Sequence, residues 1–200
     1  MRTGVVVAGG RSTRFGGRDK AVADLAGTPM IRRVADRLDS AVDGLVVNCR
    51  AEQVTSITAA LDGLDGVTFA TDERPDEGPV AGVAAGLAAV ESEYAAVVAC
   101  DMPLVDPAFV TYLFERARGR DGAVPRPDEW LQPAQAVYRT EPMLAACRGA
   151  LERGERRLRD AVAELDCAVV QREAIRRHGA LPSLENVNTP AELDAVAEQL

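Results

Sequence analysis

Short apolar runs alternate with helical patterns along the first half of this chain of 200 residues. Four of the runs, rich in valine and alanine, predict strands buried on both faces, since neither face is left polar. They cover residues 4–8, 44–49, 67–70 and 95–100. Apolar side chains at helical spacing predict helices over residues 30–38, 52–61 and 79–90, and Asp106-Pro107 opens another. Thr28-Pro29 is expected to cap the first helix, with the proline at its first helical position.

This alternation is typical of βαβ units, in which helices connect parallel strands and cover both faces of the sheet. The predicted fold class is therefore α/β: a single three-layer Rossmann-like domain over residues 1–200 with a mostly parallel central sheet. Ligands of such sheets bind beyond the carboxyl ends of the strands, near the point where the strand order reverses. Chemistry is therefore expected where the predicted strands end.

The pattern is less regular after Gly122, where a proline-rich loop contains the single tryptophan, Trp130. Further elements are expected as a strand over residues 135–138, helices over 141–151 and 156–165, and an edge strand over 168–171. Residues Thr189 to Glu192 form the pattern of a capping box, which predicts a C-terminal helix.

The net charge of -8 excludes classes of partner that require a basic surface. Nucleic acids and anionic membranes bind through basic patches, so neither is expected as a partner. A local group of arginines in a cleft can still bind an anionic substrate. No apolar run reaches the length of a membrane span, and no basic segment with a cleavage site opens the chain, so a cytoplasmic protein is expected.

The cysteines and the histidine are not spaced as a zinc site. Cys49, Cys100, Cys147 and Cys167 form no C-x-x-C pair, and His178 is the only histidine. The first, second and fourth of these cysteines lie in apolar runs, where cysteine is usually a small buried hydrophobic residue. The histidine is expected at the surface, and the absence of a G-x-S-x-G motif leaves a hydrolase triad without support.

The first predicted strand runs into a glycine-rich segment, residues 8–20, with the sequence AGGRSTRFGGRDK. Its glycines permit close approach of the backbone to a ligand, and its amides can cradle phosphate oxygens. Of the 23 lysines and arginines only Lys20 is a lysine, and it closes this segment. The spacing is neither that of a Walker A loop nor that of G-x-G-x-x-G. We therefore expect a phosphate-binding loop of another kind, the alternative being a surface turn with solvated arginines.

The segment from Val7 to Lys20, V-A-G-G-x-S-x-R-F-G-G-x-D-K, resembles the signature loop of pyrophosphorylase-type nucleotidyltransferases. It is most similar to that of the molybdenum cofactor guanylyltransferase family, since sugar-nucleotide pyrophosphorylases usually space the lysine differently. Three later segments resemble the same family in the same order: Gly78-Pro79-Val80-Ala81-Gly82, Cys100-Asp101-Met102-Pro103 and Asn186-Val187-Asn188-Thr189-Pro190. The resemblance extends from residue 4 to residue 199.

The resemblance implies an enzyme that transfers GMP from GTP to the terminal phosphate of molybdopterin and releases pyrophosphate. Residues 1–105 would bind the nucleotide and residues 106–200 the acceptor, with molybdenum cofactor biosynthesis proteins or acceptor apoenzymes as further partners. The catalytic residues that it implies are Lys20, Arg14 and Asp101. The nucleotide-binding residues are Val7, Ala8, Gly9, Gly10, Lys20, Asn48, Asp72, Gly78, Pro79, Gly82 and Asp101.

Three polar residues at strand ends also have an interpretation from position alone. Asp101 ends the fourth strand, where a carboxylate can hold Mg²⁺, an ion that prefers one or two carboxylates together with phosphate oxygens. The alternative is a turn aspartate. Asn48 and Asp72 follow from the resemblance as base or ribose contacts, whereas by position each is equally a turn residue.

Amides and arginines in the second half are candidates for the acceptor site, because molybdopterin carries a phosphate and a hydrogen-bonding pterin. We select Gln135, Asn186 and Asn188. Arg156 and Arg157 also qualify, but their charged run is typical of a solvated helix start. Asn188 has a similar alternative, as a turn residue before the capping box.

Two other classes of function stay open at this point. One is a related transferase with another base or acceptor: a CTP:molybdopterin cytidylyltransferase, or a guanylyltransferase for a cobamide precursor or phospholactate. The other is a non-catalytic nucleotide-binding or cofactor-delivery protein. The combination of Lys20 and Asp101 argues against the second class, since binding alone needs no metal-holding acid beside a phosphate-binding lysine.

Overall fold

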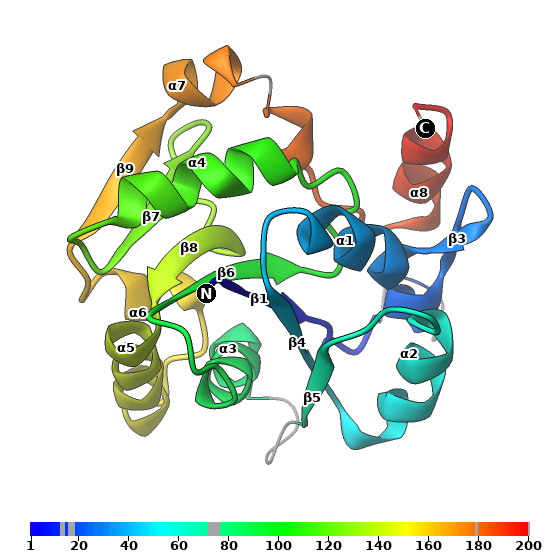
Figure 1. Cartoon of the computed structure of the whole chain (residues 1–200), viewed down its shortest axis with the longest axis horizontal. Helices are drawn as coiled ribbons and strands as arrows, with labels where there is room; N and C mark the ends of the chain where they lie inside the picture. Colours follow the sequence, from blue (N-terminus) through cyan, green and yellow to red (C-terminus); the bar gives the residue numbers. More distant parts are fainter. Residues whose placement is uncertain (13–14, 16–18, 72–76, 179, 200) are drawn as a thin grey trace.

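A seven-stranded sheet forms the centre of the computed structural model, which describes residues 1–12, 15, 19–71, 77–178 and 180–199 (Figure 1). Its strand order is β5-β4-β1-β6-β8-β7-β9. The strands are β1 (Thr3–Val7), β4 (Gly44–Cys49), β5 (Val67–Thr71), β6 (Tyr94–Ala99), β7 (Gly122–Arg126), β8 (Gln135–Arg139) and β9 (Cys167–Gln171). Within the described residues β8 alone runs against the others, so the mostly parallel α/β sheet is confirmed.

The strand order reverses at β1, which pairs with β4 on one side and β6 on the other. The last residue of β1, Val7, lies opposite Asn48 of β4 and Ala99 of β6. The carboxyl ends of three parallel strands therefore meet at one edge of the sheet. In doubly wound sheets this is the position where the diverging connections leave room for a ligand.

Helices cover both faces of the sheet. They are α1 (Met30–Asp39), α2 (Val54–Ala60), α3 (Pro79–Ala88), α4 (Pro107–Ala117), α5 (Thr140–Glu152), α6 (Leu158–Val162), α7 (Arg172–Arg177) and α8 (Pro190–Ala197). In Figure 1, α1 and α4 lie above the sheet and α3 and α5 below it. The three layers follow from alternation along the strands, because neighbouring side chains point to opposite faces.

The two faces bury two separate hydrophobic clusters. Val6 and Val47 belong to the cluster that contains the buried side chains of α1 and α4, whereas Val5 and Val46 belong to the cluster with α3, α5 and α6. All four valines are at most 4% exposed. Since both faces are fully covered, the strands need apolar residues at every position, which is the pattern that the sequence shows.

A third, smaller cluster joins the two ends of the chain. Leu25, from the short hairpin of β2 (Asp24–Leu25) and β3 (Thr28–Pro29), and Met30 of α1 pack with Phe15 of the glycine-rich segment. Val187 and Val196 of the C-terminal region complete this cluster. The capping box of α8 forms as predicted: the Thr189 side chain accepts from the Glu192 amide, and the Glu192 carboxylate accepts from the Thr189 amide. The C-terminal segment is thereby held near the glycine-rich loop.

Several local predictions differ from the structure. Thr28 and Pro29 form strand β3, and Pro29 is the N-cap of α1 without a side-chain hydrogen bond, so the predicted capping arrangement is wrong. Strand β7 was not predicted, because its glycine and its proline, Gly122 and Pro125, are atypical of a strand, yet it lies between β8 and β9. Helix α7 was also not predicted, and the helix expected over residues 156–165 is shorter, Leu158–Val162.

The predictions for individual side chains are mostly confirmed. Cys49 and Cys100 are buried, but Cys167 is only partly buried because it opens the edge strand β9. His178 is exposed and stacks on Tyr112, with the ring centroids 4.0 Å apart. In the described part of the chain, no helix has the length and apolar character needed to cross a membrane.

Candidate active site

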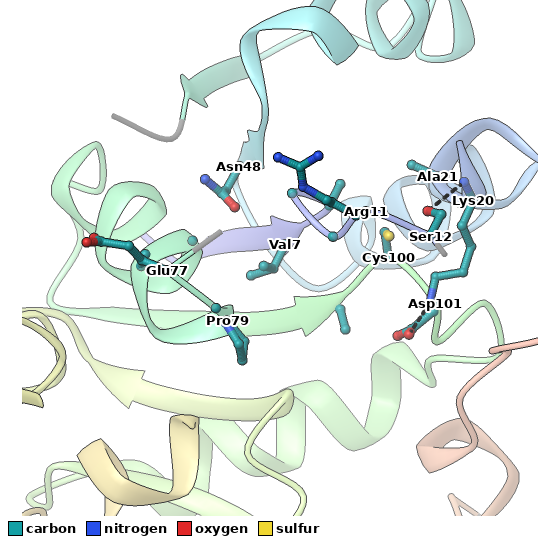
Figure 2. Close-up of a pocket in the computed structure, with 17 residues that line it drawn as sticks. Val7, Arg11, Ser12, Lys20, Ala21, Asn48, Glu77, Pro79, Cys100 and Asp101 are labelled. Atoms are coloured by element: carbon teal, nitrogen blue, oxygen red, sulfur yellow. Dashed lines mark hydrogen bonds and ion pairs between the residues drawn. The ribbon is translucent and has the colours of Figure 1, made fainter. Parts of the chain in front are cut away.

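A cavity of about 430 Å³ opens at the carboxyl ends of β1, β4 and β6, where the strand order reverses (Figure 2). Three parts of the chain surround it: the glycine-rich loop, the start of α3 and the end of β6. Its lining residues are Val7, Ala8, Gly9, Gly10, Arg11, Ser12, Lys20, Ala21, Asn48, Glu77, Gly78, Pro79, Ala81, Gly82, Ala99, Cys100 and Asp101. The volume is suitable for a small-molecule substrate such as a nucleotide.

Backbone pairing holds the start of the glycine loop between the neighbouring strands. The amide of Ala8 donates to the carbonyl of Asn48 at 2.8 Å, and the amide of Cys100 donates to the carbonyl of Val7 at 3.0 Å. The loop therefore leaves the sheet at a defined point. Further along it, the Ser12 hydroxyl accepts from the Lys20 amide at 3.0 Å, which connects the two sides of the loop.

Lys20 and Asp101 form an ion pair at one end of the cavity. The Lys20 Nζ lies 2.6 Å from the Asp101 Oδ2, and the two side chains are 16% and 14% exposed. The second carboxylate oxygen, Oδ1, accepts from the Asn186 Nδ2 at 3.0 Å. Gln132 in turn donates from Nε2 to the Asn186 Oδ1 at 3.2 Å. Each Asp101 oxygen thus has its own donor, which fixes the carboxylate plane at the cavity wall.

The N-terminus of α3 forms the opposite side of the cavity. Gly78 is the N-cap residue with φ +80°, and Pro79 occupies the first turn, where a missing amide costs nothing. Gly78 also lies against the Arg156 backbone, since a Cβ at residue 78 would be 2.8 Å from the Arg156 carbonyl oxygen. The amide end of a helix carries partial positive charge, so this side of the cavity suits an anion.

Gly82 permits a close approach of α3 to β4. A Cβ at this residue would lie 2.5 Å from the Asn48 Oδ1 and 3.1 Å from the Val7 Cγ1. The Asn48 Nδ2 donates to the Ala70 carbonyl at 3.2 Å, which orients the fully buried side chain. The glycine therefore sets the width of the cavity beside the ends of β1 and β4.

Cys100 also lines the cavity, and its thiol stays protonated. Burial, followed by the charge of Asp101, raises the pKa of its thiol to about 12. A thiol that is neutral at physiological pH is a poor nucleophile. The protonated thiol therefore gives no support for a covalent intermediate on this cysteine.

The donors that the described residues offer are compatible with Mg²⁺. No group of three or more His, Cys, Asp or Glu side chains gathers in the part of the chain that the structure describes. Asp101 instead offers one carboxylate at the wall of a cavity suited to phosphate. Mg²⁺ typically binds through one or two carboxylates and completes its shell with phosphate oxygens and water.

The structure brings most of the predicted nucleotide-binding residues together around this one cavity. Those on its lining are Val7, Ala8, Gly9, Gly10, Lys20, Asn48, Gly78, Pro79, Gly82 and Asp101. Asp72 and Arg14 lie outside the described residues. Segments that the sequence separates widely are thus neighbours in space, as the convergence of parallel strand ends requires.

The predicted acceptor residues occupy different environments. Asn186 contacts Asp101 directly, as described above. Asn188 belongs to the α8 cap, where its backbone amide donates to the Glu192 Oε2 at 2.6 Å. Gln135 is fully buried, and its Nε2 donates to the Ser183 Oγ at 3.1 Å, so its carboxamide supports the packing of residues 180–184. Arg156 and Arg157 are exposed.

The sequence reasoning missed some residues of the site. Arg11, Ser12 and Glu77 line the cavity, although none of the three was selected from the sequence. Their positions inside or beside the glycine segments were the available signal. Arg50 and Gln53, which contact the glycine loop from outside the cavity, had no recognisable signal in the sequence.

The sequence and the fold are similar to those of known nucleotidyltransferases. Residues 4–173 match the family described as "MobA-like NTP transferase domain". The chain belongs to this family. A family member from Natronomonas pharaonis, named a probable molybdenum cofactor guanylyltransferase, is 55% identical over 199 residues, covering 100% of this chain and 98% of the relative. One of the same name from Haloferax mediterranei is 42% identical, covering 99% and 94%.

A solved structure of the same kind confirms the architecture of this MobA-like chain. The molybdopterin-guanine dinucleotide biosynthesis protein A from Archaeoglobus fulgidus superposes with a TM-score of 0.81 at 26% identity, covering 100% of this chain and 98% of the other. Sequence and structure comparisons therefore agree with the predicted family, and the chain is a nucleotidyltransferase by family.

Proposed function

We propose that this chain transfers GMP from GTP to the terminal phosphate of molybdopterin, with release of pyrophosphate, and so makes the guanine dinucleotide form of the molybdenum cofactor. The observation that carries the proposal is the Lys20–Asp101 pair in the glycine-loop cavity. A cation and a carboxylate side by side, opposite a helix N-terminus, suit a reaction in which a charged phosphate chain is held and cleaved. The names of the relatives support guanine and molybdopterin as the two partners of the reaction.

The chemistry asks little of the protein by way of proton transfer. The phosphate of the acceptor is already ionised at neutral pH, so its oxygen attacks the α-phosphorus of GTP without a strong general base. Positioning and charge neutralisation supply most of the rate acceleration in phosphoryl-type transfers. The bond to the α-phosphorus forms from the acceptor side as the bond to the β-phosphate oxygen breaks.

The residues of the cavity have distinct parts in this reaction. Lys20 and the amides of the glycine loop neutralise charge on the departing pyrophosphate. The family resemblance implies the same role for Arg14, which lies outside the described residues. The N-terminus of α3 faces the nucleotide from the other side. Asp101 would hold Mg²⁺, which when bound neutralises charge on the phosphate oxygens. Asn186 orients Asp101 through the hydrogen bond from its Nδ2 to the Asp101 Oδ1.

The decisive experiment is pyrophosphate release from GTP, CTP, ATP and UTP, each with and without molybdopterin. The proposal expects release only with GTP and molybdopterin together, in the presence of Mg²⁺. Release with CTP instead would identify a cytidylyltransferase. GTP binding without pyrophosphate release under any condition would support the non-catalytic class and contradict the proposal.

A further inference from the structure

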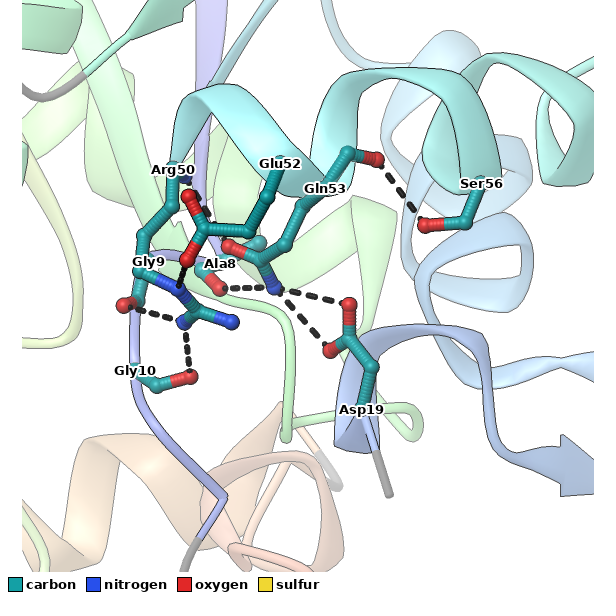
Figure 3. A network of polar contacts seen from close by, with 8 residues as sticks. All are labelled: Ala8, Gly9, Gly10, Asp19, Arg50, Glu52, Gln53 and Ser56. Carbon is teal, nitrogen blue, oxygen red and sulfur yellow. Dashed lines mark hydrogen bonds and ion pairs between the residues drawn. The ribbon is translucent and has the colours of Figure 1, made fainter. Parts of the chain in front are cut away.

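Arg50 contacts the glycine loop from the side that faces away from the cavity. It follows β4 directly, and its Nη1 donates to the carbonyl of Gly9 at 2.8 Å and to that of Gly10 at 2.6 Å (Figure 3). Its Nε donates to the Glu52 Oε1 at 2.7 Å, and only 14% of its side chain is exposed. Arg50 is not among the residues that line the cavity, whereas Gly9 and Gly10 are.

The planarity of the peptide bond gives these contacts a consequence for the cavity. In a trans peptide the carbonyl and the following amide point in opposite directions. Because Arg50 holds the Gly9 and Gly10 carbonyls, the amides of Gly10 and Arg11 are directed to the opposite side. A phosphate approaching this loop therefore meets N–H donors rather than carbonyl oxygens, which would repel it.

Gln53 makes a second connection from the same turn. This residue ends the 3-10 helix η3 (Ala51–Gln53) and is 2% exposed. Its Nε2 donates to the Ala8 carbonyl at 3.1 Å and to the two Asp19 carboxylate oxygens at 3.0 and 2.9 Å. Its Oε1 accepts from the Arg50 amide at 2.9 Å. One buried carboxamide thus bridges the beginning and the end of the glycine loop.

The connection to Asp19 reaches the catalytic lysine. Asp19 is the N-cap of the 3-10 helix η2 (Lys20–Val22), and its Oδ1 accepts from the Ala21 amide at 3.1 Å. Gln53 therefore holds the residue that precedes Lys20, while Arg50 holds the residues at the other end of the loop. Glycine-rich backbone has many accessible conformations, so a loop of this composition needs external contacts to keep one of them.

The charges of the turn are balanced within it. The Glu52 carboxylate accepts a hydrogen bond from the Arg50 Nε and forms an ion pair with this arginine. A backbone hydrogen bond and, next, the hydrogen bond from Arg50 lower the pKa of Glu52, so it stays ionised. The arginine consequently brings donors to the loop carbonyls without adding net charge to the turn.

We propose that Arg50 and Gln53 are positioning residues for nucleotide binding, which hold the glycine loop so that its amides face the phosphates of the nucleotide. Neither side chain lines the cavity, so both act through the loop and not by contact with the substrate. The inference rests on the proposed function for the identity of the nucleotide. Its physical content, a loop shaped for anions by contacts from behind, is independent of the base and of the acceptor.

Arg33 provides a matched control for Arg50. Its Nε and Nη2 donate to the carbonyls of two consecutive residues, Leu25 and Ala26, at 2.7 and 2.9 Å. These residues belong to the β2–β3 hairpin and do not line the cavity. Arg50→Met and Arg33→Met therefore remove the same kind of contact, from a glycine loop in one case and from a remote turn in the other.

The test measures dissociation constants of GTP, pyrophosphate and guanosine with Mg²⁺ present, together with KM and kcat. Arg50→Met is expected to weaken the binding of GTP and of pyrophosphate by about tenfold or more. Loss of the hydrogen bond from a single loop amide to a phosphate oxygen is enough to produce a change of that size. Guanosine lacks phosphate, so its affinity should change by less than about twofold. Arg33→Met should bind all three ligands like the wild type, whatever its effect on Tm.

Gln53 is tested by introducing a negative charge and then rescuing its effect. Gln53→Glu puts a second carboxylate against Asp19, and we expect KM for GTP to rise by about tenfold or more. Adding Asp19→Asn restores a donor and an acceptor between the two side chains and should recover the part of the loss that comes from the contact with Asp19, while the Ala8 carbonyl stays without the Gln53 donor. A general loss of folding would not be repaired specifically by the second substitution.

Failure of this inference can be distinguished from failure of the proposed function. If the wild type transfers GMP but Arg50→Met and Gln53→Glu keep wild-type KM and pyrophosphate affinity, the positioning role is wrong and the function stands. If the wild type transfers no nucleotide but Arg50→Met still loses pyrophosphate affinity, the function is wrong and the loop inference stands. Should Arg50→Met not fold, Arg50→Lys keeps the charge without the forked donors and should show a raised KM at unchanged Tm; a wild-type KM in that variant would contradict the inference.

Discussion

Lys20 and Asp101 are 81 residues apart in the sequence, yet the Lys20 Nζ and the Asp101 Oδ2 lie 2.6 Å from each other. The pair connects the end of the glycine loop to the end of β6 across the point where the strand order reverses. Both side chains are mostly buried, and the ion pair places the two opposite charges side by side where they have little contact with water. Arrival of a phosphate chain gives Lys20 a new partner in the same place.

Lys20→Ala is expected to lose turnover far more than folding. Loss of one preorganised charge that stabilises the transition state costs roughly 10²- to 10³-fold in kcat. The change also leaves Asp101 without its cation, but Asp101 keeps the hydrogen bond from Asn186, so a modest drop in Tm is expected. Steady-state pyrophosphate release and thermal unfolding of the same preparation check this. Near wild-type transfer by Lys20→Ala would show that the loop has been assigned wrongly.

Asp101→Asn is expected to abolish Mg²⁺-dependent transfer while the fold is kept. The asparagine retains the shape and one acceptor oxygen, but it lacks the charge that Mg²⁺ requires of its protein ligand. The measurement is a titration of transfer activity with Mg²⁺ for the two proteins. Activity that survives in Asp101→Asn and still requires Mg²⁺ would rule out the metal role of this carboxylate.

Asn186 is expected to act through Asp101 rather than on the acceptor. Its Nδ2 donates to the Asp101 Oδ1 at 3.0 Å, and Gln132 holds its other amide atom. Asn186→Ala should therefore lower kcat/KM by about tenfold in the wild-type background, as a hydrogen bond to a charged group is worth about 1.5–3 kcal/mol. Because Asp101 would hold Mg²⁺, Asn186→Ala should also raise the Mg²⁺ concentration needed for half-maximal transfer, and it should leave KM for the acceptor unchanged. A raised KM for the acceptor at an unchanged Mg²⁺ requirement would instead favour direct contact with the acceptor.

The sequence was sufficient to predict those residues of the site that the strand topology alone brings together. Parallel strands end at one sheet edge, so the order of apolar runs was sufficient to place Val7, Asn48 and Asp101 near each other. Contacts between side chains from unrelated loops could not be read in this way. Nothing in the spacing of Arg50 and Gln53 shows that they meet the glycine loop, since the turn after β4 can direct them elsewhere.

The difference between local sequence preference and tertiary pairing also explains which secondary-structure elements were predicted wrongly. Strand β7 carries Gly122 and Pro125, which argue against a strand when only local propensity is considered. Its neighbours β8 and β9 supply the pairing partners that overcome this preference. Thr28 and Pro29 have the composition of a helix start, but pairing with Asp24 and Leu25 takes precedence. Tertiary pairing decided each of these cases.

Gly82→Ala is expected to destabilise the protein and impair nucleotide binding together. The new Cβ would lie 2.5 Å from the Asn48 Oδ1, so α3 or the Asn48 side chain must move. Overpacking of this kind costs about 1–3 kcal/mol. Gly149→Ala is the control: it also lies within a helix, but its Cβ would meet only the flexible end of Arg153 at 3.2 Å. That change should be neutral or stabilising by up to about 1 kcal/mol, because alanine favours helix.

The two Gly→Ala variants are compared by urea unfolding and by KM for GTP. A displaced Asn48 or α3 alters the cavity directly, so Gly82→Ala should raise KM, whereas Gly149→Ala should leave it unchanged. Equal stability of the two variants would contradict the close approach of α3 to β4. If Gly82→Ala is destabilised but keeps the wild-type KM for GTP, this glycine is needed for packing and not for the shape of the nucleotide site.

The buried thiols should make the protein less stable at alkaline pH. Burial raises the pKa of Cys100 and Cys147 to about 12, from an ordinary value of 9.0. Above pH 9 the unfolded chain therefore releases protons that the folded chain keeps, so the free energy of unfolding falls as pH rises from 9 towards 12. Each such thiol contributes a slope approaching roughly 1.4 kcal/mol per pH unit in that window, and none below it.

Urea unfolding with a reductant at pH 8, 9 and 10 measures the slope. Cys147 lies away from the cavity. In Cys147→Ala, the free energy of unfolding should fall less steeply above pH 9, by the slope that one thiol contributes. Below pH 9 it should differ from the wild-type value by a constant amount. An unchanged slope in that variant would mean that the Cys147 thiol is not shielded from ionisation in the folded state.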